Sequence, residues 1–242
     1  MLPELTTEEW SEALDAVAGQ LIAELPSAAP PIDALRLART LGLTVAWDER
    51  QPSRGRMARL AALGTGAGAS ILVRPDPRPE RLQWAIAHEI GEFCAHRVFD
   101  SLAVDPREAP PAAREAVANH LASRILLPRA SFAEDGRACD WVLFDLKARY
   151  ASASHELIAR RMLDMGPSVV ITIFDHGRRT LRRSNLPFRV PPLGETESAA
   201  WETAHRQAVS VDRADYRQRV QAWPVHEPEW KREILRTEWF GD

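Results

Sequence analysis

Residues 87–96 read AHEIGEFCAH, and the interpretation of the whole chain starts from this stretch. If it is helical, His88, Glu92 and His96 share one face, because residues four apart lie about one turn apart. Glu89 is then offset from this stripe by about 100°. The spacing is that of H-E-x-x-H, whose first and fifth residues bind a metal ion while the acid at the second position activates water. Here Glu92 stands at the fifth position.

Three interpretations of the stripe remain open from the residues alone. A carboxylate oxygen can bind zinc, so an altered metal site is chemically sound. The helix could instead belong to a site that has lost its metal. In the third interpretation it is a solvated face on which Glu92 pairs with His96. His96 lies about 12 Å along the helix from His88, too far to share one tetrahedral ion with it. Cys94 falls off the stripe and is expected to be a small buried residue.

The bulk composition excludes several classes of protein. The 242 residues include 45% hydrophobic and 27% charged residues with a net charge of −3, so no global field attracts nucleic acid or anionic membrane. Two cysteines are too few for a disulfide framework, which favours a reduced, cytoplasmic protein. The acidic N-terminus does not have the pattern of a signal peptide, and the sequence has no apolar run long enough to span a membrane.

The pattern along the chain predicts mixed secondary structure. Thr6 and Glu9 form a capping box before a helix that extends to about residue 25. Further helices are predicted at 32–41, 80–98, 112–127, 129–135, 140–149 and 151–166, and strands at 43–49 and 69–75. Residues 168–185 read as a β-hairpin that turns near His176-Gly177, the last fifty residues look helical, and residues 50–68 are not assigned.

A second block, EAVANHLASRILLP at 115–128, supports the interpretation of the first block as part of a metal site. Together the two blocks resemble the ImmA/IrrE family of metallopeptidases, over roughly residues 30–175. The matching positions are Trp84, Ala87, His88, Glu89, Gly91 and His96 in the first block, and Glu115, Ala118, Asn119, Ala122, Leu126, Leu127 and Pro128 in the second.

The resemblance implies roles for individual residues. His88 would be the first zinc ligand, Glu89 the general base and Glu115 the third protein ligand. Asn119 is expected beside the ligands, and His96 is expected either beside the ligands or as a residue of the helix C-terminus. The family has a histidine where this chain has Glu92, which we expect to be the second ligand. A carboxylate in place of an imidazole lowers the net charge of the site by about one unit, makes zinc a weaker Lewis acid and suits Mn²⁺ or Fe²⁺ better than an imidazole does.

The expected fold is α+β, with a zincin-like core of helices and a short β-sheet and a mostly helical C-terminal extension. The expected segments are an N-terminal helix at 1–30, a metallopeptidase core with a helix-turn-helix-like end at 31–166, and the hairpin with the extension at 167–242.

The function implied by the resemblance is regulatory proteolysis by a metal-dependent endopeptidase, in a stress or mobile-element response. The substrate would be a protein, such as a DNA-binding repressor. The alternative is a catalytically impaired relative that binds a protein or DNA. Arginines at 160, 161, 178, 179, 182 and 183 could read DNA, but the acidic Glu156 and Asp164 beside them favour packed helices and a solvated hairpin.

Overall fold

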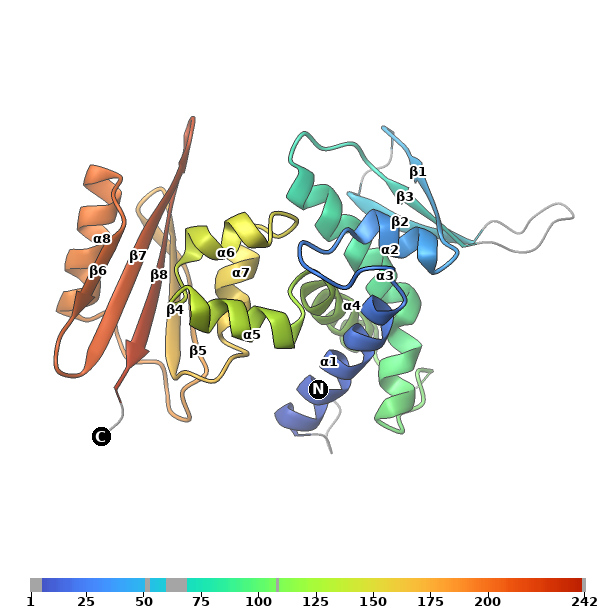
Figure 1. Ribbon diagram of the computed structural model, residues 1–242, viewed down its shortest axis with the longest axis horizontal. Helices are drawn as coiled ribbons and strands as arrows, with labels where there is room; N and C mark the ends of the chain where they lie inside the picture. The colour runs from blue at the N-terminus through green and yellow to red at the C-terminus, as the bar shows by residue number, and fades with distance from the viewer. Residues whose placement is uncertain (1–5, 51–52, 60–68, 108, 241–242) are drawn as a thin grey trace, which may run out of the picture. The chain divides into compact units, whose positions relative to one another are not determined.

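The computed structural model describes residues 6–50, 53–59, 69–107 and 109–240. Contacts divide the chain into two compact units (Figure 1). The first comprises residues 1–135 and 148–154, and the second comprises residues 136–147 and 155–242. The predicted division into 1–30, 31–166 and 167–242 stays a prediction.

The first unit packs helices against a small sheet. Its helices are α1 (Thr7–Ala23), α2 (Ala34–Thr40), α3 (Pro79–Ser101) and α4 (Pro111–Leu126). Its strands are β1 (Thr44–Trp47), β2 (Gly55–Arg59) and β3 (Ala69–Val73), in the order β1-β3-β2. β1 runs parallel to β3 and β2 runs antiparallel to it. The helices α1 and α3 both pack against α4, so the core of the unit lies among these three.

The helix boundaries follow from capping. Thr6 and Glu9 form the predicted capping box at the start of α1. Pro79 and Pro111 occupy the first turns of α3 and α4, where a missing N–H costs nothing. The unassigned segment 50–68 contributes β2, and its residues 51–52 and 60–68 lie outside the described part of the chain.

The second unit is built on an antiparallel sheet in the order β5-β4-β8-β7-β6. Its strands are β4 (Val169–Asp175), β5 (Arg178–Ser184), β6 (Val211–Ala214), β7 (Gln218–Glu227) and β8 (Trp230–Trp239). The predicted hairpin is β4–β5, and His176 and Gly177 make its turn with φ values of 50° and 76°. α8 (Glu195–Gln207) packs on β6, β7 and β8 over a core that includes Phe174, Ala200 and Leu235 (Figure 1).

Three short helices come between α4 and the hairpin. They are α5 (Arg129–Ala138), α6 (Leu143–Arg149) and α7 (His155–Met162). The sequence predicts helices at these places, and α7 is shorter than the predicted 151–166.

The α+β class is confirmed, but the last fifty residues differ from the helical expectation. Only α8 is helical there, and β6, β7 and β8 follow it. Glu233 and Arg236 are charged residues that are buried in β8. Because they interrupt the alternation of polar and apolar residues that identifies a strand, the sequence pattern does not predict β8. Among the described residues, no helix is long and apolar enough to cross a membrane.

Candidate metal centre

The helices α3 and α4 approach each other closely at Gly91. A Cβ atom built on Gly91 would lie 2.6 Å from the backbone oxygen of Ala118, so only a glycine fits there without movement. Small side chains such as Ala87, Ala118 and Ala122 are buried in these two helices. The close approach brings the polar side chains of α3 near Glu115 of α4.

The structure brings the predicted site residues together. Ligand atoms of His88, Glu89 and Glu92 all lie within 4.8 Å of one another. His88 Nε2 lies 3.8 Å from Glu115 Oε2. Asn119, one turn along α4, donates a hydrogen bond of 2.9 Å from Nδ2 to Glu115 Oε1 and so restrains that carboxylate.

Glu89 is the buried member of the group, with 4% of its surface exposed, whereas Glu92 and Glu115 are exposed. Burial raises the pKa of Glu89 to about 7, and the nearby carboxylates of Glu92 and Glu115 act in the same direction. A hydrogen bond from the backbone of Met57 in β2 opposes this shift. A carboxylate with such a pKa can accept and return a proton near neutral pH.

The residues present fit a divalent cation. His88 Nδ1 and Glu89 Oε2 are buried, and neither has a hydrogen-bond partner among the described residues. Buried polar atoms without partners are uncommon, and a bound ion or water molecule is one of their ordinary explanations. One imidazole with two carboxylates is also a donor set that binds zinc and harder divalent ions.

The other polar candidates on α3 and α4 are not members of the group of ligand atoms formed by His88, Glu89 and Glu92. His96 is exposed, and its Nδ1 lies 3.1 Å from the carbonyl oxygen of Phe93 on its own helix. Its predicted place beside the ligands stays a prediction. Cys94 is fully buried, and burial raises the pKa of its thiol to about 11. His120 is exposed on α4.

Sequence reasoning missed the contribution of β2. A Cβ on Gly55 would lie 2.8 Å from Glu89 Oε1, so this glycine lets the strand lie directly against the carboxylate. The segment RGRMARL has no hydrophobic periodicity that predicts a strand. A contact between residues more than thirty positions apart cannot be predicted from a single sequence.

Sequence reasoning also missed a second group, formed by His205, His226 and Glu233, whose ligand atoms lie within 4.8 Å of one another. These residues come from three different elements, so no motif spacing joins them.

Several of the arginines considered for DNA recognition are held in ion pairs. Arg160 pairs with Glu156, and Arg182 pairs with the buried Glu197. Arg161 is buried and pairs with Asp164. These contacts agree with the packing interpretation that the acidic neighbours favour.

Comparisons with known proteins extend these observations. The family model described as Peptidase_M78, IrrE N-terminal-like domain, matches residues 41–163, just over half of the chain. A solved structure titled Mycobacterium tuberculosis transcriptional regulator is similar with a TM-score of 0.66 and 18% sequence identity, covering 94% of this chain and 76% of that chain. At this identity the likeness concerns the fold alone. The comparison with curated proteins gave no match.

Proposed function

Because the chain belongs to the Peptidase_M78 family of IrrE N-terminal-like domains, we propose that it is a divalent-metal-dependent endopeptidase. The family confirms the resemblance carried by the two sequence blocks, and it supports a metallopeptidase-type function and a divalent metal in general terms. The observation that carries the specific proposal is the gathering of His88, Glu89 and Glu92 on α3 beside Glu115 of α4.

The proposed ligands are His88, Glu92 and Glu115. Zn²⁺ is the proposed ion, and the two carboxylates also suit Mn²⁺ or Fe²⁺. Asn119 holds Glu115 in place through its 2.9 Å hydrogen bond. When bound, the ion supplies Lewis acidity at the peptide carbonyl.

Glu89 is the proposed general base. Its carboxylate takes a proton from the attacking water and passes it to the leaving amine. The hydrogen bond from the backbone of Met57 orients the carboxylate. Burial keeps bulk water away from Glu89, so that its proton affinity is set by the protein.

The proposed substrate is a peptide bond in a protein. Among the described strands, β2 lies at one edge of the sheet order β1-β3-β2, and it packs against α3 next to Glu89. An extended peptide can add to such an edge by main-chain hydrogen bonds. The family resemblance implies a DNA-binding repressor as the protein that is cut, which accords with a regulatory role.

The test uses the full chain with added Zn²⁺ or Mn²⁺ and a library of proteome-derived peptides, with cleavage read by mass spectrometry. We expect cleavage that Glu89→Gln and His88→Gln abolish and that Glu80→Gln, at the start of the same helix, leaves unchanged. Cleavage by Glu89→Gln at the native rate would refute Glu89 as the base. Absence of stoichiometric divalent metal from the purified protein would refute the metal dependence.

The replacement of the family histidine by Glu92 favours one alternative function, a catalytically impaired relative that binds a protein or DNA partner. The similar solved structure is titled a transcriptional regulator, which is compatible with this alternative. The variant Glu92→His separates the two. A gain in zinc affinity would place position 92 among the ligands, and a native protein that never cleaves although Glu92→His does would favour the impaired relative.

A further inference from the structure

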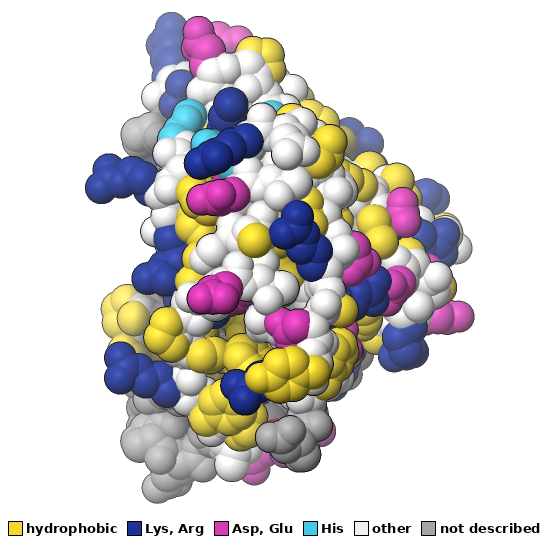
Figure 2. Space-filling view, turned by 90° about the vertical axis from the view of Figure 1, so that its left-hand side faces the viewer, with side chains coloured by type: hydrophobic (Ala, Val, Ile, Leu, Met, Phe, Trp, Pro, Cys, Tyr) yellow, Lys and Arg dark blue, Asp and Glu magenta, His cyan; other side chains and the backbone are white. Residues whose placement is uncertain are grey.

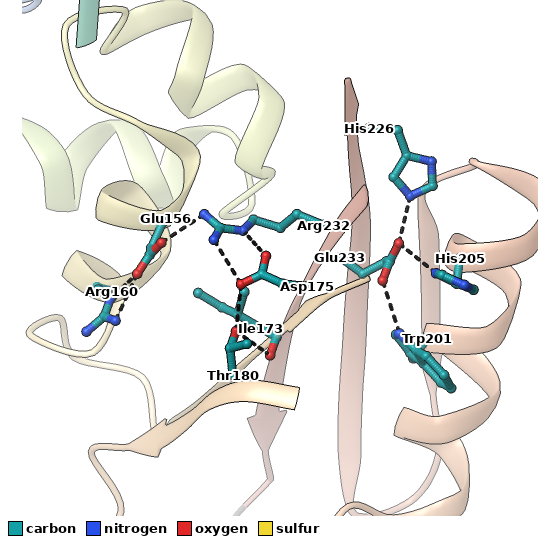
Figure 3. A network of polar contacts seen from close by, with 10 residues as sticks. All are labelled: Glu156, Arg160, Ile173, Asp175, Thr180, Trp201, His205, His226, Arg232 and Glu233. Atoms are coloured by element: carbon teal, nitrogen blue, oxygen red, sulfur yellow. Dashed lines mark hydrogen bonds and ion pairs between the residues drawn. The ribbon is translucent and has the colours of Figure 1, made fainter. Parts of the chain in front are cut away.

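A second group of metal-binding residue types lies in the other unit, outside the peptidase match. His205 comes from α8, His226 from β7 and Glu233 from β8. Figure 3 shows the two imidazoles and the indole of Trp201 directed at the Glu233 carboxylate. Three different elements thus bring two imidazole nitrogens and one carboxylate oxygen close together.

The two imidazoles converge on the same oxygen atom. His205 Nδ1 lies 2.9 Å and His226 Nε2 lies 2.7 Å from Glu233 Oε1. In a tetrahedral zinc site with bonds of about 2.0–2.1 Å, neighbouring ligand atoms lie about 3.3 Å apart. Binding of an ion would therefore move each imidazole nitrogen away from the carboxylate oxygen by roughly half an ångström.

The charge of Glu233 also needs a partner. Its side chain is completely buried, and a buried carboxylate is costly unless a positive charge compensates it. The neighbouring Arg232 points to the opposite face of β8, where it pairs with Asp175 and Glu156 (Figure 3). Within the described part of the chain, the side chains that contact the Glu233 carboxylate through hydrogen bonds are those of His205, His226 and Trp201.

The surroundings restrain the side chains of the group. Trp201 Nε1 donates to Glu233 Oε2 at 3.2 Å, which leaves Oε1 for the imidazoles. The Trp201 ring stacks on Phe174 at 4.8 Å and on His205 at 5.4 Å between centroids. A donor on the second carboxylate oxygen and a ring that fixes the histidine are the kind of support that surrounds metal ligands in proteins.

We infer that His205, His226 and Glu233 bind a divalent transition-metal ion, with Zn²⁺ as the expected occupant. Two imidazoles and a carboxylate are a known three-ligand set for zinc. The side chains of His205 and His226 are 28% and 19% exposed, so solvent reaches the group and can fill the fourth position. Figure 2 views the unit from the side of α8 and shows histidine side chains at the surface among Lys and Arg. The ion would tie α8 to the β7–β8 hairpin.

The test measures how many metal ions the full chain binds when the proposed peptidase site is disabled by His88→Gln. Purified His88→Gln protein is stripped with a chelator and titrated with Zn²⁺ against a chromophoric chelator, and with Co²⁺ by visible absorption. We expect one equivalent to bind and to raise the melting temperature. Adding His226→Asn should weaken binding by more than about 100-fold, because a ligand is lost and not an outer-shell partner.

The matched control is His176→Asn in the same unit. His176 sits at the hairpin turn with φ 50°, a conformation that asparagine tolerates, and its ring packs on Trp230. This variant should bind the ion normally. Glu233→Gln keeps the shape of the buried side chain, and it should lose the metal while circular dichroism shows a retained fold.

Trp201→Phe tests whether the indole supports the metal ligands. It keeps an aromatic ring but removes the donor to Glu233 Oε2, so affinity should fall by about 10- to 100-fold, as for other outer-shell partners. Two outcomes would overturn the inference. In the first, the native protein binds Zn²⁺ or Co²⁺ but the His88→Gln protein binds neither. In the second, binding persists after His226→Asn is added. Both leave the peptidase proposal standing, whereas peptide cleavage that survives His88→Gln removes that proposal alone.

Discussion

Gly91 lies so close to the backbone of Ala118 that a Cβ atom would come within 2.6 Å of the Ala118 carbonyl oxygen. This contact sets the separation of α3 and α4. His88 and Glu115 project from the same two helices, and their ligand atoms are 3.8 Å apart. The geometry of the candidate metal centre therefore depends on a glycine that bears no functional group.

The variant Gly91→Ala should push α3 and α4 apart, because backbone atoms cannot yield as a flexible side chain can. We expect a loss of about 1–3 kcal/mol in the free energy of unfolding, the usual cost of overpacking, together with weaker metal binding. Urea denaturation and a Zn²⁺ competition titration measure the two effects. Gly19→Ala on α1, where an added Cβ would meet no atom within 4 Å beyond its own stretch of helix, is the matched control and should be neutral or slightly stabilising.

Gly55→Ala probes the strand beside the base. The added methyl group would lie 2.8 Å from Glu89 Oε1, so the carboxylate must rotate, while no backbone clash is involved. We expect a fall in kcat with little change in KM or in melting temperature. A variant that instead lost stability and kept its kcat would show that Gly55 serves the fold and not the orientation of Glu89.

The sequence alone predicts the two helices that carry the candidate site residues, because these residues stand at helical spacing on α3 and on α4. His88, Glu89 and Glu92 lie within about one turn of helix, and Glu115 and Asn119 lie four residues apart. Their mutual position comes from tertiary packing at Gly91. The contacts of Glu89 with β2 also depend on that packing, and no local pattern encodes them.

The last three strands of the second unit cannot be recognised in the sequence, and the reason is a different one. Its strands bury charged residues such as Arg236 and Glu233, which break the alternation that identifies a strand. The tryptophans of this region, at irregular spacing, gave no period either. The group formed by His205, His226 and Glu233 depends on a sheet register that only the folded chain defines.

The pKa of Glu89 predicts how the metal-free protein responds to pH. Its pKa rises from 4.5 to about 7 on folding, so between these values the folded state keeps a proton that the unfolded state has released. Stability must then fall as pH rises through this window. The full effect is on the order of 3 kcal/mol, at about 1.4 kcal/mol per pKa unit.

Urea denaturation of chelator-treated protein at several pH values checks this prediction. The native chain should lose stability relative to Glu89→Gln between pH 4.5 and about 7, and the difference should level off above that range. Parallel curves for the two proteins would mean that Glu89 titrates at its ordinary pKa. Added Zn²⁺ should reduce the difference, because a nearby cation favours the ionised carboxylate.

The buried ion pair of the second unit predicts a large loss of stability from a single change on α8. The side chains of Glu197 and Arg182 are 1% and 7% exposed. Nη1 and Nη2 of Arg182 each donate to Glu197 at 2.9 Å, and Thr237 Oγ1 also donates to it. Glu197→Ala leaves a buried guanidinium without its carboxylate, which should cost about 3–5 kcal/mol. On the same helix, Glu202→Ala removes only an exposed contact with Arg206 at 3.9 Å and should cost less than about 1 kcal/mol. Chemical denaturation of both variants measures the difference, and equal losses would contradict a stabilising role for the buried pair.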